Sequence, residues 1–154
     1  MLGAILEQFR IDSLGILGAT HWARLLNHGI TRSTERSADL LAVKLWAFLH
    51  DSQRHDDYGD RLHSKRGAEY ATSLNTVYFE LSSPRLDLLF ETIEHHSDGK
   101  DHTHKTIQTC WDADRLDLGR VHITQNPRFL SQEATKYIDE AYLSSQEHTK
   151  EKRL

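Results

Sequence analysis

Histidine and aspartate side chains recur on the apolar stripes of several predicted helices. Five remote segments carry them: His21, His50-Asp51, His63, His95-His96 and Asp114. Imidazole and carboxylate groups are costly in a dry core unless they are paired or bound to a cation. A shared metal centre explains all five segments by one cause, and such mixed ligands suit Mn²⁺, Fe²⁺, Co²⁺, Ni²⁺ or Zn²⁺. The pattern therefore predicts metal-assisted hydrolysis.

Asp114 is the candidate metal ligand of the predicted helix over 103–118. Ile107, Trp111 and Leu118 mark a buried stripe on this predicted helix, and Asp114 lies on that stripe. Asp112 lies roughly 200° from Asp114, at about 100° per residue, so both cannot reach one centre. We favour Asp114, although a lone buried aspartate also fits a helix cap or an ion pair with arginine. Asp117 faces a different side from Asp114 and is expected to serve only its own helix.

The doublet His50-Asp51 ends the most apolar stretch of the chain. A lone histidine there is more often a hydrogen-bonded core residue than a ligand. The adjacent Asp51 changes this expectation, because the chain unwinds at a helix end and both side chains can then face one ion. His21 and His96 also lie on apolar stripes, whereas His63 begins a helix and equally fits an exposed position.

Helices must position these residues, because no segment alternates as a strand does. Hydrophobic periodicity predicts helices over 13–30, 34–50, 61–75, 83–96, 103–118 and 131–146. The segment 34–50 is apolar almost all round and should be central, with Ser33 or Thr34 as its cap. Residues 76–82 fit either a short helix or an extended connector. The prediction is an all-α bundle of six or seven helices.

Length and composition limit the remaining possibilities. The 154 residues suit a single domain, 1–154, with a core of about 13–146 and a frayed C-terminal tail. A net charge of −4 does not suggest a nucleic-acid partner, and no apolar run approaches the ~20 residues of a membrane span. The single Cys110 fits a reducing cytoplasm. Residues 1–9 can pack on their own core or on a partner chain, which leaves a homo-oligomer open.

The order of these residues resembles the HD-domain superfamily of metal-dependent phosphohydrolases. Leu49-His50-Asp51 matches the doublet that names the family, and His21 precedes it as the family's upstream histidine does. The family's final aspartate often lies in the context found at Ala113-Asp114-Arg115-Leu116. The resemblance covers the chain from about Gly18 to beyond Arg120.

Two further elements resemble family members that hold two metals. His63-Ser64-Lys65-Arg66-Gly67 is similar to their His-x-x-x-Gly element, and His95-His96-Ser97-Asp98-Gly99 to their His-His and Asp-Gly elements. Lys100-Asp101-His102 stands where the cyclic-dinucleotide phosphodiesterases have Gly-Tyr-Pro, which argues against that substrate. The resemblance implies one or two divalent ions, drawn from Mn, Fe, Co, Ni, Zn or Mg. The implied ligands are His21, His50, Asp51 and Asp114 for the first ion, and His63, His95 and His96 for the second.

The predicted function is that of a metal-dependent phosphohydrolase, in which metal-activated water attacks a small phosphate ester, a nucleotide or a related phosphomonoester. The expected phosphate-binding residues are Arg54, Lys65, Arg66 and Arg115. His55 and Asp56 are candidates for an acid/base group or for support of the metal ligands. The alternatives are a non-catalytic metal- or ligand-binding helical module and a helical interaction domain with incidental histidines.

Overall fold

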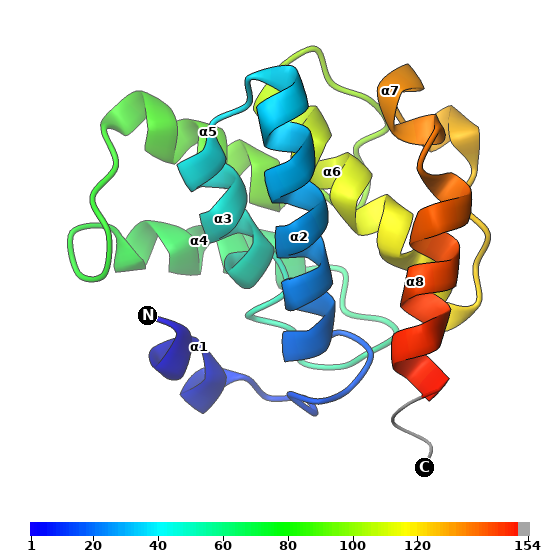
Figure 1. The fold of residues 1–154 in the computed structure, drawn as a ribbon. Coiled ribbons are helices and arrows are strands. Elements are labelled where there is room, and N and C mark those ends of the chain that lie inside the picture. Colours follow the sequence, from blue (N-terminus) through cyan, green and yellow to red (C-terminus); the bar gives the residue numbers. More distant parts are fainter. Residues whose placement is uncertain (151–154) are drawn as a thin grey trace.

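The computed structural model describes the backbone of residues 1–150 and the side chains of residues 1–146. This part of the chain forms eight α-helices and two short 3-10 helices: α1 (Leu2–Gln8), α2 (Ala19–Arg36), α3 (Leu40–Leu49), α4 (His63–Leu74), α5 (Ser83–Glu94), α6 (Lys105–Leu116), η1 (Asp117–Val121), η2 (Pro127–Phe129), α7 (Gln132–Thr135) and α8 (Ile138–Lys150). No strand occurs among the described residues, which confirms the all-α prediction (Figure 1). The helix count exceeds six or seven because α1 and the short α7 were not predicted as separate helices.

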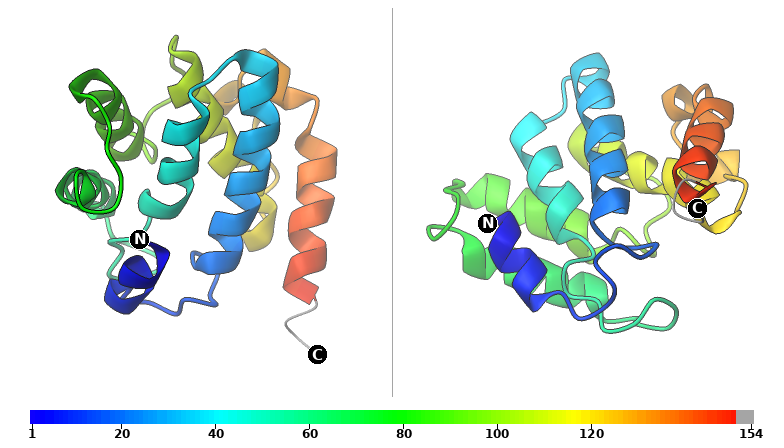
Figure 2. Two further views of the ribbon diagram at one scale, coloured as in Figure 1. Left: turned by 60° about the vertical axis from the view of Figure 1, so that its left-hand side comes forward. Right: turned by 60° about the horizontal axis from the view of Figure 1, so that its bottom comes forward.

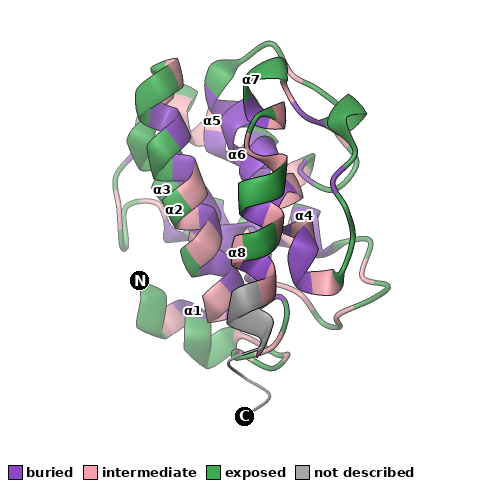
Figure 3. Cartoon of the chain, turned by 45° about the vertical axis from the view of Figure 1, so that its right-hand side comes forward, coloured by how far each residue is buried: buried purple, intermediate pink, exposed green. Residues whose placement is uncertain are grey.

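Helix α3 forms the centre of the bundle. Its residues Val43, Trp46, Ala47 and Leu49 are completely buried, and α2, α4, α5 and α6 all contact it. In Figure 1, α2 rises and α3 descends beside it, joined by a short connection. Figure 3 shows the buried residues gathered on the inward faces of these helices, while α1 is largely exposed and the described part of α8 is buried on one side only. None of the described helices is long and apolar enough to cross a membrane.

The boundary between α2 and α3 differs from the prediction. Ser33 and Thr34 were expected to cap the second of these helices, but both lie inside α2. Their hydroxyls donate to the carbonyls four residues earlier, so the helix continues through them. Asp39 is the true cap of α3, because its carboxylate accepts hydrogen bonds from the N–H groups of Leu41 and Ala42.

Four other segments can be compared with what the sequence predicts for them. Residues 76–82 do not form the short helix: residues 76–78 form a turn that is closed by an isolated bridge between Asn75 and Phe79, and only residues 80–82 form an irregular connector. The segment 131–146 is two helices, because α7 ends before Ile138 begins α8. The predicted frayed tail is helical as far as Lys150, and residues 151–154 lie outside the described residues. Helix α1 packs on its own chain through Ile5, which is completely buried.

The fold brings five helix ends together at one end of the bundle. The amino-terminal ends of α2 and α4 meet the carboxyl-terminal ends of α3, α5 and α6 there, and the right-hand view of Figure 2 brings this end forward. Gly67 lets α4 approach the end of α3. A Cβ atom at Gly67 would lie 3.0 Å from the carbonyl oxygens of Leu49 and His50, and 3.2 Å from Ile93 Cγ2.

We expect Gly67→Ala to lower the free energy of unfolding by about 1–3 kcal/mol, because the added methyl group overpacks the contact with two backbone carbonyls. Alanine's better helix propensity would return only about 0.5–1 kcal/mol. Urea unfolding measures the difference. Gly3→Ala in α1 is the matched control, since a Cβ there meets nothing within 4 Å, and it should not destabilise the protein. A Gly67→Ala protein as stable as the wild type would refute the close approach.

Candidate metal centre

Four histidines and two aspartates converge where the helix ends meet. His21 lies in the first turn of α2, His50 and Asp51 follow α3, and His63 begins α4. His96 follows α5 by two residues, and Asp114 lies in the last turn of α6. All except Asp114 are buried, and His21 and His50 have no exposed surface at all. The structure therefore brings together residues that are as much as 93 positions apart in the sequence.

Asp51 is at the centre of this cluster, and its two carboxylate oxygens face different histidines. Oδ2 lies 3.5 Å from His50 Nε2 and 4.0 Å from His21 Nε2. Oδ1 lies 3.3 Å from His63 Nε2 and 3.4 Å from His96 Nε2. The cluster thus contains two groups that could each hold a metal ion, and Asp51 belongs to both.

The other ring nitrogen of each histidine faces an oxygen acceptor. The Nδ1 of His50 lies 3.2 Å from the Trp46 carbonyl, and that of His96 lies 2.7 Å from the Ile93 carbonyl. His63 Nδ1 contacts the Asp60 carbonyl, and His21 Nδ1 lies 2.7 Å from Asp117 Oδ2. Because a carbonyl or carboxylate only accepts, each Nδ1 must carry the hydrogen. This tautomer leaves Nε2 available as a ligand, as in histidines that bind metals.

The surroundings of the four Nε2 atoms fit a cation. Those of His21 and His50 are buried without a hydrogen-bond partner. The Nε2 atoms of His63 and His96 lie 3.2 Å apart, so two lone pairs would face one another unless a proton or a cation lay between them. Buried polar groups are rarely left in this state. The donor set of imidazole and carboxylate suits a divalent transition metal.

The electrostatics keep the carboxylates ionised and two of the imidazoles neutral. Burial lowers the pKa of His50 to about 3, and burial together with Arg120 lowers the pKa of His21. Burial alone would raise the pKa of Asp51, but His50, His63 and His96 hold it well below its usual range. Burial would also lower the pKa of His96, but its interaction with Asp51 raises it instead.

Asp114 joins the cluster from α6, on the side of His21. Its Oδ1 lies 3.5 Å from His21 Nε2, and its side chain is 22% exposed, so this side of the cluster reaches solvent. Arg120 Nη2 lies 3.8 Å from the same oxygen, and Arg120 Nη1 is buried without a hydrogen-bond partner. Sequence reasoning missed Arg120, because it follows α6 in the irregular η1 segment, where no periodicity marks a side chain as buried.

Asp117 was expected to face away from Asp114 and to serve its own helix, and this expectation was wrong. The side chain is completely buried and accepts the His21 Nδ1–H hydrogen bond. Arg24 binds it twice, with Nε 2.6 Å from Oδ1 and Nη2 2.9 Å from Oδ2. Burial alone would raise the pKa of Asp117, but His21 and Arg24 lower it to about 2. The helical angle misled because α6 ends at Leu116, just before this residue.

The four basic residues expected near the substrate phosphate lie in different surroundings. Arg54 Nε is 2.9 Å from Asp51 Oδ1, so this guanidinium borders the cluster. Lys65 is largely exposed and pairs loosely with Glu69. Arg66 is held by the Gln53 carbonyl and by Asp60. Arg115 donates to the carbonyls of Gly99, Lys100 and Phe129. Of the four, only Arg54 lies against a residue of the cluster.

Three further expected residues lie outside the cluster. The His95 side chain is 52% exposed and lies near Glu94 and Asp98, so it does not join the histidines around Asp51. The second residue of the His-His pair is buried and faces the cluster, whereas the first, at the end of α5, is exposed. Asp56 accepts the N–H groups of Tyr58 and Gly59 in an exposed turn, and His55 is exposed in the same loop.

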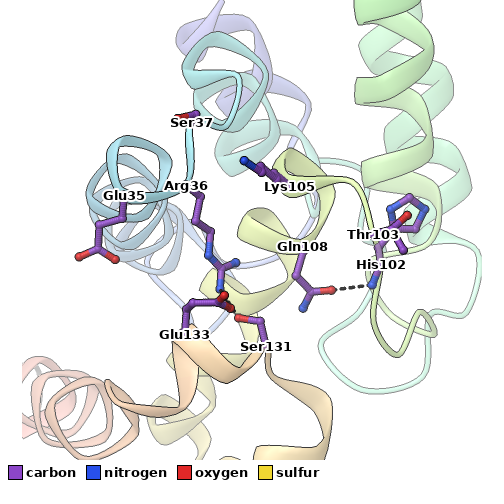
Figure 4. A pocket seen from close by; sticks show the side chains of 9 residues that line it. All are labelled: Glu35, Arg36, Ser37, His102, Thr103, Lys105, Gln108, Ser131 and Glu133. Carbon is purple, nitrogen blue, oxygen red and sulfur yellow. Dashed lines mark hydrogen bonds and ion pairs between the residues drawn. The ribbon is translucent and has the colours of Figure 1, made fainter.

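Asp112 belongs to a separate buried network, as the helical geometry predicted. Arg36 Nη1 and Ser131 Oγ donate to its Oδ2, and Gln108 Nε2 donates to its Oδ1. These partners also line a polar pocket of about 410 Å³ (Figure 4), where Gln108 also accepts a hydrogen bond from the backbone N–H of His102. None of the cluster residues around Asp51 lines this pocket. Asp112 therefore ties α2, α6 and the start of α7 together.

Comparison with known proteins identifies the fold. No protein-family model matches the sequence, and no curated protein matches it. A crystal structure described as a predicted HD superfamily hydrolase, from an uncultured Thermotogales bacterium, superposes with a TM-score of 0.71 at 24% sequence identity. The match covers 97% of this chain and 87% of that chain. Together with the His50-Asp51 doublet inside the buried cluster, this likeness shows that the chain has the HD-domain fold.

Proposed function

We propose that this protein is a metal-dependent phosphohydrolase that acts on a small phosphate monoester. The observation that carries the proposal is the arrangement around Asp51, where four Nε2 atoms converge on one buried carboxylate while each Nδ1 is held by an oxygen acceptor. The proposed ligands of one ion are His21, His50, Asp51 and Asp114. Those of a second ion are Asp51, His63 and His96. His95 is not proposed as a ligand, because its side chain is half exposed and lies outside the cluster.

The chain's own groups define how such a reaction would be organised. A bound divalent cation supplies a nucleophilic water near neutral pH and draws charge from a phosphoryl oxygen. The bundle excludes solvent from one side of the cluster, while the partly exposed Asp114 marks the side from which a substrate enters. Ionised Asp51 and Asp114 neutralise the cation's charge, and the fixed Nδ1–H groups keep the imidazoles oriented.

Two guanidinium groups flank the cluster and are proposed to hold the phosphate. Arg54 lies beside Asp51 on one side, and Arg120 lies beside Asp114 on the other. Arg54 Nε pairs with Asp51, and Arg120 Nη1 lies 3.6 Å from Asp117 Oδ2, so the phosphate is proposed to bind to the remaining N–H groups of the two guanidiniums. A guanidinium matches phosphate geometry better than an ammonium does. The structural neighbour is described as a predicted HD superfamily hydrolase, which supports the same class of reaction.

The adjacent residues His95 and His96 allow a first test of the proposed metal ligands. His96→Ala should weaken Mn²⁺ binding to the metal-free protein by at least about tenfold, because it removes a buried imidazole from the cluster. Isothermal titration calorimetry measures the change. His95→Ala is the matched control, since that side chain is half exposed and lies outside the cluster, and its affinity should equal that of the wild type. Equal losses in the two variants would contradict the assignment.

Asp117→Asn should lower the affinity for Mn²⁺ by about 10–100-fold, although Asp117 is not a proposed ligand. The neutral side-chain amide of this variant no longer stabilises the His21 tautomer that presents Nε2 to the cluster. Asp112→Asn is the matched control, because Asp112 is equally buried and equally bound to an arginine but lies outside the cluster. Both variants should lose stability, and only Asp117→Asn should lose metal affinity. A normal affinity in Asp117→Asn would show that its role is structural alone.

A metal-supplemented screen tests the activity itself, with nucleoside monophosphates, sugar phosphates and cyclic nucleotides as substrates and phosphate release as the measurement. Asp51→Ala should abolish both bound metal and turnover while circular dichroism shows unchanged helical content. Asp87→Ala, on the exposed side of α5, should behave as the wild type. Wild-type turnover in Asp51→Ala would remove the proposed site, and metal binding without turnover in the wild type would favour a non-catalytic metal-binding module.

A further inference from the structure

Arg32 is a buried cation that lacks a carboxylate partner. It lies in α2, and only 3% of the residue is exposed. Arg24, on the same helix, is paired with the buried Asp117. Arg36, one turn after Arg32, is paired with the buried Asp112. Among the residues with described side chains, no carboxylate is paired with Arg32, and its Nε is buried without a hydrogen-bond partner. A buried charge is costly in this state, which indicates that a ligand supplies the missing anion.

Neighbouring groups hold the Arg32 guanidinium in a fixed position. Its Nη1 donates to the His28 carbonyl oxygen at 3.0 Å and to His28 Nδ1 at 3.3 Å. Its Cζ lies 4.2 Å from the centre of the Tyr137 ring, in a cation–π contact. Burial lowers the pKa of Arg32, and interactions with Tyr137 and Asp112 only partly offset this effect. Because an arginine side chain stays protonated in proteins, the guanidinium remains a positive group in an anion-free setting.

A small cavity between α2 and α8 is lined by this guanidinium, and the left-hand view of Figure 2 shows the two helices side by side. The cavity has a volume of about 110 Å³. It can hold more than one water molecule, but it is far smaller than the roughly 300–1,000 Å³ of sites for drug-sized ligands. The occupant must therefore be a small molecule or ion.

The α2 side of the cavity adds neutral hydrogen-bond donors to the charge of Arg32. Burial, together with Arg32, lowers the pKa of His28 to about 4, so its ring is neutral near neutral pH. Since His28 Nδ1 accepts a hydrogen bond from Arg32, the ring hydrogen is on Nε2. Asn27 also lines the cavity and carries a side-chain amide. One cation and two neutral donors suit a ligand with several acceptor oxygens and a negative charge.

We propose that this cavity is a binding site for a small oxyanion, a phosphate or a carboxylate, whose oxygens accept hydrogen bonds from the Arg32 guanidinium. The planar fork of a guanidinium matches the oxygens of both groups. The site is independent of the proposed phosphohydrolase function, because none of the residues that line the cavity belongs to the histidine cluster around Asp51.

Glu140 is the acidic residue among the described residues that line the cavity. It lies in the first turn of α8, is exposed, and is not paired with Arg32. Its carboxylate repels an incoming anion and competes with it for the guanidinium. Glu140→Gln should therefore strengthen anion binding about two- to fivefold, the range expected for one exposed charge pair.

Nuclear magnetic resonance of the ¹⁵N-labelled full chain tests the site directly. Sodium phosphate is titrated at constant pH and ionic strength, and sodium acetate in a second titration. The Arg32 Nε–H signal, assigned by its loss in Arg32→Gln, should shift and saturate, whereas that of the exposed Arg128 should not. In Arg32→Gln, the shift of the Asn27 backbone amide should need at least about tenfold more anion, because a charge-assisted hydrogen bond is lost.

The outcomes decide between an anion and the chain's own carboxylate. Saturation with phosphate alone, or with acetate alone, identifies which oxyanion the cavity takes. Should Arg32→Gln fail to fold, Glu140→Gln still tests the site, because it keeps the Arg32 signal and should bind more tightly. An Arg32 signal that neither anion moves in either protein overturns the proposal. Shifts at Arg54 and Arg120 report phosphate at the proposed metal centre, so the two sites are distinguished in one titration.

Discussion

The burial of one carboxylate among four imidazoles constrains the rest of this structure. An ionised aspartate in the interior of a helical bundle is stable only when charged or hydrogen-bonding partners surround it. Asp51 obtains these partners from the ends of α2, α4 and α5, together with its neighbour His50. The helices must therefore end where they do, and Gly67 must leave room for α4 beside the end of α3. The packing of the apolar core and the geometry of the polar cluster are consequently parts of one arrangement.

The histidines are oriented by two different means. His50, His63 and His96 each direct Nδ1 at a carbonyl three or four residues earlier, so the backbone near a helix end fixes the ring. His21 instead depends on Asp117, which lies 96 residues away and is itself held by Arg24. The local arrangement needs only a helix end and a histidine near it. The orientation of His21 by Asp117 needs a correctly packed η1 segment. Substitutions elsewhere in the fold can therefore disturb the His21 ring more easily than the other three.

This difference also explains how much could be predicted from the sequence. The helices carrying the cluster, the central position of α3 and the convergence of His21, His50, Asp51 and Asp114 follow from periodicity and from the HD-type motif. The predictions that the structure does not bear out concern residues at or beyond the ends of the helices. The angular argument for Asp117 assumed that α6 continues, Arg120 lies in an irregular segment, and the caps of α2 and α3 depend on whether a hydroxyl bonds within its own helix. The opposite directions of His95 and His96 likewise follow from the local turn after α5. Such features depend on tertiary contacts and on backbone geometry at single residues, which hydrophobic patterning does not encode.

The spacing of the proposed ligands along the chain has a further consequence. They begin in the first turn of α2 and end in the last turn of α6, and α3, α4 and α5 each supply or precede one of them. An ion held by them joins segments that are otherwise connected only through long stretches of polypeptide. Such an ion would therefore act as a reversible crosslink between remote segments, much as a disulfide bond does in proteins that have a pair of cysteines. With a single buried Cys110, this protein has no internal disulfide bond, and an ion bound to the cluster would give its helices a comparable tie.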